Sequence, residues 1–229
     1  MHTPCSVVLI PGFMLDETLW DEFKRYLPGD WTVFDAVVSG DGTIKAIARH
    51  IAESAPQRFV LIGFSLGGYI ARQLAADYPE RVSALVVVAS SLREDTAEQA
   101  QSKNQTLQAL SQTTFRGLST GSISRSLHPS RASDTTLIAR IQQMGQRLGY
   151  DAFALQSALR RADIPADSIA CPTLVVASTH DRLRSLEEAN QLVSTIPNAS
   201  LRLFDGSGHM IPLEQPQELA ETILGWLGS

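Results

Sequence analysis

The sequence has little cysteine, no long apolar run and no excess of basic charge. Only two of its 229 residues are cysteines, Cys5 and Cys171, so we expect reduced thiols in the cytoplasm rather than a disulfide framework. No stretch of about 18 consecutive apolar residues is present, which excludes an ordinary transmembrane helix. The net charge is −5 and the basic residues are scattered. We therefore expect neither nucleic acid nor a membrane surface as a partner.

A signal peptide is not expected either. Residues 1–5 contain no charged segment of the kind that opens a leader, and they pass directly into a strand-like run. Apolar residues make up 44% of the chain and charged residues 19%, which is typical of a globular protein. The length fits one large domain or a domain with an inserted segment. The sequence does not indicate an oligomeric state.

Short apolar runs alternate with segments of helical spacing along much of the chain. Because most of these runs are apolar on both faces, they are typical of parallel strands covered by helices on each side. Thr43 is a candidate N-cap for one helix, and Pro79 is expected to end another. We predict an α/β fold, with a mostly parallel sheet flanked by helices. The expected strands cover residues 7–10, 33–37, 59–62, 85–88, 174–177 and 201–204.

The middle of the chain interrupts this alternation. Residues 91–167 contain no strand-like run and are rich in Ser, Thr, Gln and Arg. We expect a helix over 94–110, a loose stretch over 111–126, and further helices over 137–148 and 153–162. We interpret this segment as a small helical lid or cap inserted into an α/β core formed by residues 1–90 and 168–229. The alternative is a helical subdomain with no gating role.

The most informative motif is Gly63-Phe64-Ser65-Leu66-Gly67, which follows an expected strand and precedes an expected helix. A serine on so sharp a turn needs neighbours without a Cβ. Its hydroxyl then lies at a helix N-terminus, where free N–H groups favour developing negative charge. A tight turn or a phosphate-binding loop is the alternative. Ser65 is therefore the candidate nucleophile.

A serine needs a base to remove its proton, and the chain has five histidines. His209 is the best candidate because it lies on a glycine-rich loop after the last expected strand. His180 also follows a strand and remains an alternative. His2 is close to the terminus, His50 is expected on the solvent face of a helix, and His128 precedes a proline in a polar loop.

An acidic residue is needed to orient the imidazole. Asp181 follows an expected strand and gives the order serine, aspartate, histidine along the chain, as sheet hydrolases of this kind have. Asp95, after the preceding strand, is the alternative. Asp205 is interpreted as a loop cap, and Asp163 and Asp167 as solvated or capping groups.

Two backbone N–H groups are candidates for stabilising an oxyanion. Phe13 follows the first strand, which should lie beside the strand that carries the serine, and Leu66 directly follows the serine. Nearby apolar side chains suggest a substrate with an apolar part. Met14 and Met210 are the candidate contacts, with Met144 from the middle segment as a weaker one; a plain core role is the alternative.

These motifs together resemble the α/β-hydrolase superfamily, and the chain resembles a compact member of the serine esterase or lipase type. The departures are Pro11, where the superfamily often has a histidine, and the residues flanking Asp181, which lack the usual glycine and proline. The likeness extends over nearly the whole chain, in Ile10-Pro11-Gly12-Phe13, residues 63–68, residues 78–82, Asp181 and residues 206–214.

The resemblance implies that Ser65 attacks an acyl carbon, His209 acts as base and Asp181 orients it. The N–H groups of Phe13 and Leu66 would form the oxyanion hole, and no cofactor or metal would be needed. We therefore expect a hydrolase that acts on a small carboxylic ester, thioester or lactone through an acyl-enzyme. The alternatives are a C–C bond hydrolase, lyase or perhydrolase that uses the same three residues, or a non-catalytic ligand receptor.

Overall fold

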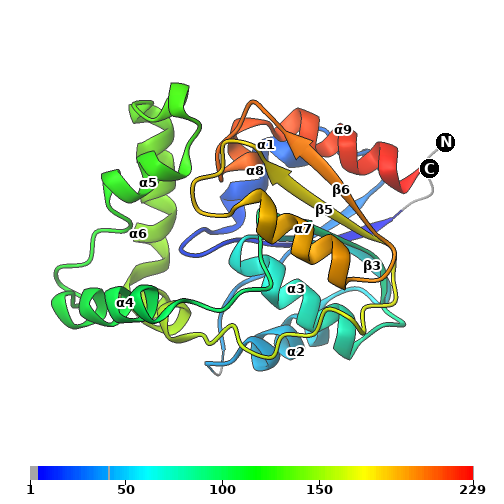
Figure 1. Cartoon of the computed structure of the whole chain (residues 1–229), viewed down its shortest axis with the longest axis horizontal. Helices are drawn as coiled ribbons and strands as arrows, with labels where there is room; N and C mark the ends of the chain where they lie inside the picture. Colours follow the sequence, from blue (N-terminus) through cyan, green and yellow to red (C-terminus); the bar gives the residue numbers. More distant parts are fainter. Residues whose placement is uncertain (1–4, 41, 229) are drawn as a thin grey trace.

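Six parallel strands form one sheet within the described part of the chain, residues 5–40 and 42–228 of a computed structural model (Figure 1). The predicted α/β architecture with a parallel, helix-flanked sheet is confirmed. The interpretations placed on residues 1–4, including His2, lie outside the described residues. The strands run in the order β2-β1-β3-β4-β5-β6 and are β1 (Ser6–Ile10), β2 (Thr32–Asp35), β3 (Phe59–Phe64), β4 (Val82–Val88), β5 (Thr173–Ser178) and β6 (Ala199–Phe204).

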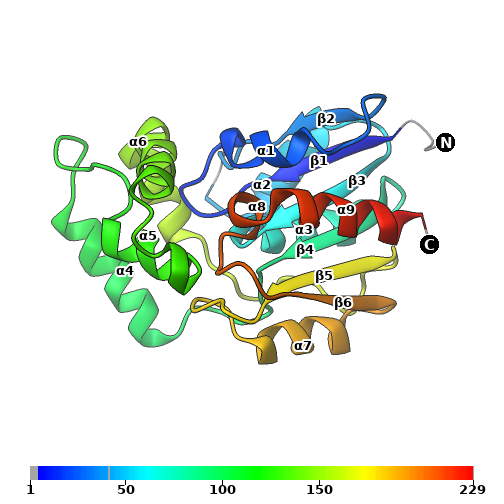
Figure 2. The ribbon, with the colours of Figure 1, turned by 90° about the horizontal axis from the view of Figure 1, so that it is seen from above.

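Both faces of the four central strands, β1, β3, β4 and β5, are buried, which explains why these strands read as continuous apolar runs. Val7 and Leu9 of β1 face one hydrophobic cluster, whereas Val8 and Ile10 face the other. All four side chains are fully buried, and each stabilises the fold by roughly 1.5–3 kcal/mol. One face is covered by α1 (Asp21–Lys24), α8 (Ile211–Glu214) and α9 (Pro216–Leu227), the other by α2 (Ile44–Ser54), α3 (Leu66–Asp77) and α7 (Leu186–Thr195) (Figure 2).

The helix ends follow local sequence signals. The Thr43 side chain accepts a hydrogen bond from the Ala46 N–H at 3.1 Å and begins α2, as predicted. Helix α3 ends two residues before Pro79, which cannot continue it. A short 3-10 helix, η1 (Glu17–Trp20), links β1 to α1. No helix of the described residues is long and apolar enough to cross a membrane.

The segment between β4 and β5 holds α4 (Ala97–Ala109), α5 (Thr120–Ser126), the 3-10 helix η2 (Pro129–Arg131) and α6 (Thr135–Ala158). These helices gather at one end of the sheet, and we call them the cap (Figure 1). Helix α6 is kinked at Gly149, where φ is 78°, so the two expected helical patterns meet there. The division of the chain at residues 91 and 167 and the role of a lid stay predictions.

The expected loose stretch over residues 111–126 is wrong at its C-terminal end, where α5 forms. Ser119 caps this helix by accepting the Ser122 N–H at 3.2 Å. Ile123 is the only large apolar residue of α5, and its burial anchors the helix in the core. One apolar residue makes no periodic pattern, so the helix could not be recognised from spacing.

Candidate active site

Ser65 lies at the turn between β3 and α3, in a backbone conformation that side-chain-bearing residues rarely adopt. Its φ is 51° and its ψ is −109°, a conformation that costs on the order of 1–3 kcal/mol. Hydrogen bonds hold it in place: its N–H donates to Val88 O at 2.8 Å, and its carbonyl accepts Gly68 N–H at 3.0 Å and Ser90 Oγ–H at 2.8 Å. The strained turn is therefore fixed on both sides.

The glycines of the motif allow three chain segments to meet at this turn. A Cβ on Gly63 would lie 2.4 Å from Gly67 O, and one on Gly67 would lie 2.3 Å from Ile10 O. The start of α3 therefore packs directly against the end of β1, the strand that neighbours β3 in the sheet. This close approach places Ser65 beside the loop that follows β1, as the sequence predicts.

His209 faces the serine from the loop after β6. Its Nε2 lies 3.0 Å from Ser65 Oγ, and its ring packs against Phe64 with the ring centroids 5.1 Å apart. The cap holds this loop, because the His209 N–H donates to Ser126 O at 2.7 Å. Gly208 permits the contact, since a Cβ there would lie 2.4 Å from the carbonyl carbon of Leu127.

Asp181 completes a chain of hydrogen bonds. Its Oδ2 accepts a hydrogen bond from His209 Nδ1 at 2.7 Å, and its Oδ1 accepts hydrogen bonds from the N–H groups of Leu183 and Arg184 at 2.7 and 2.9 Å. Burial raises the pKa of Asp181, but the facing His209 and these hydrogen bonds outweigh it, so the pKa lies below its ordinary value. An ionised carboxylate only accepts hydrogen bonds, so Nδ1 carries the proton and Nε2 accepts from Ser65 O–H.

The other histidines that the structure describes form no hydrogen bond with Ser65. His180 pairs with Asp205 at 3.6 Å and packs its ring edge-on against His128 at a centroid distance of 4.5 Å. His128 also caps η2, as a turn residue would. His50 is exposed on α2, as expected.

The other candidate acids lie elsewhere as well. Asp95 forms ion pairs with Lys103 and with Arg161, the latter at 3.1 Å, and does not contact His209. Asp163 and Asp167 are exposed.

The two candidate oxyanion donors follow adjacent strands. Phe13 comes after β1 and Leu66 begins α3, and neither N–H has a hydrogen-bond partner in the part of the chain that the structure describes. Both are thus available to a bound oxygen atom beside Ser65.

The loop that carries Phe13 is held by the cap, through residues that the sequence analysis missed. Gln156 of α6, only 1% exposed, accepts the Met14 N–H at 2.8 Å. Arg147, also on α6, donates to Asp16 at 2.7 Å. A lone glutamine or arginine in a polar segment gives no sequence signal, because its partner lies more than 100 residues away in the chain.

A cavity of about 300 Å³ opens at Ser65 and His209, between the sheet and the cap. Met210 lines it, whereas Met14 and Met144 do not. The Met14 side chain is fully buried and packs with Phe115 and Phe153, so its expected contact with a substrate is replaced by a contact in the core. The cavity wall is largely apolar, formed by Phe13, Leu15, Phe64, Leu118, Ile123, Ile141, Leu183 and Met210.

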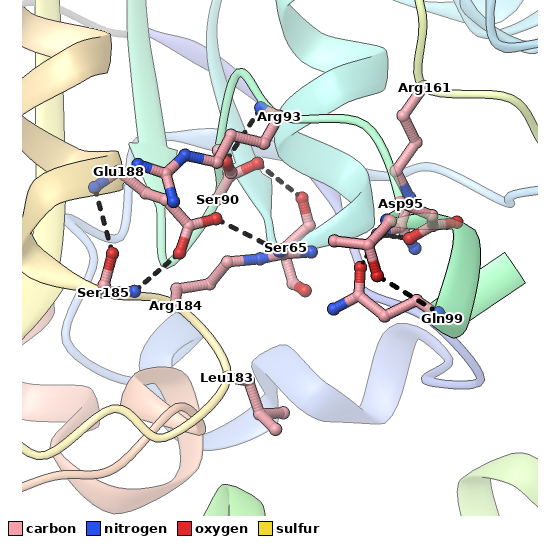
Figure 3. Close-up of polar contacts among 12 residues, drawn as sticks. Ser65, Ser90, Arg93, Asp95, Gln99, Arg161, Leu183, Arg184, Ser185 and Glu188 are labelled. Carbon is pink, nitrogen blue, oxygen red and sulfur yellow. Dashed lines mark hydrogen bonds and ion pairs between the residues drawn. The ribbon is translucent and has the colours of Figure 1, made fainter. Parts of the chain in front are cut away.

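The cavity also contains basic side chains that were not among the predicted site residues. Lys103, Arg125, Arg161 and Arg184 line it together with Ser65 and His209. Figure 3 shows Ser65 between Arg184 on one side and the Arg161–Asp95 pair on the other. Within the described residues, no group of three His, Cys, Asp or Glu side chains is placed to hold a metal ion.

The chain is similar in sequence to several curated methyl ester esterases. Pimeloyl-[acyl-carrier protein] methyl ester esterases from Citrobacter koseri and Klebsiella pneumoniae are 36% and 38% identical over 95 residues. This segment is 38% of the chain and 37% of each relative, so the chain matches little more than a third of the length of these curated proteins.

Solved structures match over the whole chain. A thermophilic esterase from Thermogutta terrifontis, described with malate bound, is 26% identical with a TM-score of 0.79, over 99% of this chain and 90% of its own. An enol-lactonase from Burkholderia xenovorans has a TM-score of 0.86 at 17% identity, over 100% and 93% of the two chains, and this likeness concerns the fold.

A family model described as the alpha/beta hydrolase fold matches residues 43–216, which is more than half of the sequence. The matched region includes the serine turn, the cap and the loops of Asp181 and His209. The chain belongs to the alpha/beta hydrolase fold family.

Proposed function

We propose that this protein is a serine hydrolase that cleaves a small carboxylic ester, thioester or lactone through an acyl-enzyme. The observation that carries the proposal is the continuous chain of hydrogen bonds from Ser65 through His209 to Asp181, at 3.0 and 2.7 Å. Nucleophile, base and orienting acid are each within the distance that proton transfer needs. The similarity to esterases supports this reaction class.

In the proposed acylation step, Ser65 Oγ attacks the carbonyl carbon while its proton passes to His209 Nε2. The oxygen of the tetrahedral intermediate takes the negative charge and receives hydrogen bonds from the Phe13 and Leu66 N–H groups. Asp181 stabilises the protonated imidazole. Collapse of the intermediate breaks the bond to the leaving oxygen or sulfur, which receives the proton from Nε2.

Deacylation repeats the sequence with water. His209 Nε2 removes a proton from the water molecule as its oxygen attacks the acyl carbon, and the proton then returns to Ser65 Oγ when the acid leaves. The apolar wall of the cavity would bind the apolar part of the acyl group or alcohol. Met210 remains a proposed substrate contact.

We also propose that the protein acts in the cytoplasm on a small-molecule substrate. Cys5 and Cys171 are free thiols, and burial raises the pKa of each. Protonated, unpaired thiols support a reducing compartment.

Replacement of the serine tests the proposed function. Ser65→Ala should abolish release of p-nitrophenol from p-nitrophenyl acetate and should abolish labelling by a fluorophosphonate probe, because no nucleophile remains. Ser54→Ala is the matched control, since it removes an exposed hydroxyl at the end of α2 that donates to the His50 carbonyl and takes no part in the serine turn. It should retain labelling. If Ser65→Ala still hydrolyses the ester, or the wild type is not labelled, the proposal is wrong.

A further inference from the structure

The basic side chains in the cavity carry more charge than their partners neutralise. Apart from His209, every charged side chain lining the cavity among the described residues is basic: Lys103, Arg125, Arg161 and Arg184.

Asp95 is shared between Lys103 and Arg161, and Glu188 pairs with Arg184 at 3.3 Å. Arg125 forms no ion pair with a described residue. Four cations thus face two carboxylates.

Arg161 is the most buried of these cations, with a side chain only 8% exposed. Its guanidinium lies 5.3 Å from the centre of the Tyr69 ring, one turn after Ser65 on α3. Its Nε is buried and has no hydrogen-bond partner among the described residues, and the same holds for the Nε of Arg184. Arg161 is thus held at the wall of the cavity by Asp95 and by the Tyr69 ring.

The directions of the pKa shifts of Lys103 and Arg161 agree with an excess of positive charge in the cavity. Burial lowers the pKa of Lys103, and repulsion by Arg161 and Arg184 lowers it further against the opposing effect of Asp95. The pKa of Arg161 is lowered by its own burial and by Arg184. An anion bound between these side chains would remove the repulsion.

We propose that the substrate carries a carboxylate and that Arg161, Lys103 and Arg184 form the subsite that binds it. This rests on the proposed function and specifies the substrate class of the same site. Guanidinium groups match the planar carboxylate and bind it more strongly than a neutral group. The largely apolar lining of the same cavity fits a short hydrocarbon segment, so we expect a small ester or lactone with an apolar part and an acidic end.

The test compares esters that differ only in this charge. For a carboxylate on the acyl side, the pair is monomethyl adipate and its neutral terminal amide, methyl adipamate. For a carboxylate on the alcohol side, the pair is 4-acetoxybenzoate and 4-acetoxybenzamide. We expect wild-type kcat/KM to be at least tenfold higher for the acid of one pair, and that pair identifies the end of the substrate that the cations bind.

Substitutions of the basic residues test whether they cause the preference for the acid over the amide. Arg161→Gln should lower the acid-to-amide ratio at least tenfold, whereas Arg161→Lys should retain part of it, because the charge remains without the planar donors. Lys103→Gln and Arg184→Gln provide the same test should Arg161→Gln fail to fold. Arg93→Gln is the matched control: Arg93 pairs with Glu187 and does not line the cavity, so the ratio should not change.

A binding measurement keeps this inference separate from the proposed function. Ser65→Ala is titrated calorimetrically with monomethyl adipate, 4-acetoxybenzoate and the amide of each. One acid should bind at least tenfold more tightly than its amide, and adding Arg161→Gln to Ser65→Ala should remove the difference. Equal binding of each acid and its amide, with hydrolysis intact, would overturn the carboxylate subsite alone. If the wild type neither hydrolyses these esters nor is labelled by the fluorophosphonate probe, the proposed function itself is overturned.

Discussion

At the scale of single residues, the site depends on a serine held in a conformation that costs energy. The left-handed φ of Ser65 is maintained by hydrogen bonds from both sides of the turn and by glycines that let β1 approach α3. The hydroxyl is thus aimed at His209 before any substrate binds. Fixed positions of this kind avoid reorganisation during the reaction.

The two candidate acids have different surroundings and should respond differently to the same change. Asp181→Asn removes the acceptor that fixes the proton on His209 Nδ1, so we expect kcat to fall by about 10⁴-fold, the size found when a triad aspartate is replaced. Asp95→Asn leaves that bond intact and should have a far smaller effect on a neutral ester. Steady-state kinetics with p-nitrophenyl acetate compares them, and the reverse ranking would show that Asp95 is the acid.

The pKa of Asp181 predicts a pH dependence of stability. Burial raises this pKa, and His209 with the backbone N–H groups lowers it more, to a net value below the ordinary 3.8. The folded state therefore releases the proton more readily than the unfolded chain. The resulting stabilisation is complete above the ordinary pKa and is lost as the pH falls through the lowered one.

Urea unfolding of wild type and Asp181→Asn between pH 7 and pH 3 measures this contribution. The difference in unfolding free energy should shrink as the pH falls below the ordinary pKa of an aspartate, because only the wild type gains a proton at this position. Other acidic groups are common to both proteins and cancel. A difference that stays constant to pH 3 would contradict the lowered pKa.

At the scale of elements, close approaches between segments determine which glycines can be replaced. A Cβ on Gly208 would lie 2.4 Å from the backbone of Leu127, whereas one on Gly225 of α9 meets nothing within 4 Å. Gly208→Ala should therefore push the His209 loop from α5 and lower both stability and kcat. Gly225→Ala should raise stability by roughly 0.5–1 kcal/mol through reduced backbone entropy. Thermal melts and steady-state kinetics measure the effect of each substitution on stability and kcat. Equal effects of the two substitutions would contradict the close packing of Gly208 against Leu127.

Helix α6 acts on the oxyanion loop through one hydrogen bond. Gln156→Leu leaves the buried Met14 N–H without a partner, at a cost of about 1–3 kcal/mol of stability. Because Met14 directly follows Phe13, we expect kcat to fall with KM little changed. The fall should not exceed the loss of about 10²–10³-fold that removal of an oxyanion donor causes. Gln143→Ala, an exposed position on the same helix, is the control. A change in KM alone would exclude this positioning role.

The elements that could be predicted from sequence are those with strong local signals. All six strands could be predicted because runs such as 59–62 are apolar on both faces. The proximity of Ser65, His209 and Asp181 could be predicted because each follows a strand at the same edge of the sheet. Helix α5 was missed because Ile123 is its single large apolar residue, which makes no periodic pattern. The basic cavity and Gln156 were missed because each depends on contacts between distant parts of the chain.

At the scale of the whole molecule, the cap and the sheet build one site together. Helix α5 supports the His209 loop, α6 supports the Phe13 loop, and the cavity is lined by both parts. Displacement of the cap would therefore alter the base and the oxyanion donors as well as the substrate pocket. We expect the two parts to lose structure together rather than independently.

Glu214 is the residue at which this coupling can be tested. Its Oε1 accepts the His128 N–H of the cap and its Oε2 accepts the Gly208 N–H of the histidine loop, both at 2.8 Å. Glutamine has one carbonyl oxygen, so Glu214→Gln leaves one of these N–H groups facing another donor, at a cost of about 1–3 kcal/mol. Hydrogen exchange should rise in residues 119–131 and 206–210 alike.

The control is Glu221→Gln, because Glu221 is exposed on α9 and its carboxylate accepts a hydrogen bond from Gln217 of the same helix. It should leave exchange in both segments as in the wild type. Faster exchange confined to residues 206–210 in Glu214→Gln would mean that the cap is held independently of the histidine loop. Faster exchange in both segments, with a matching fall in kcat, would mean that the cap and the base move as one unit, because a single carboxylate joins them.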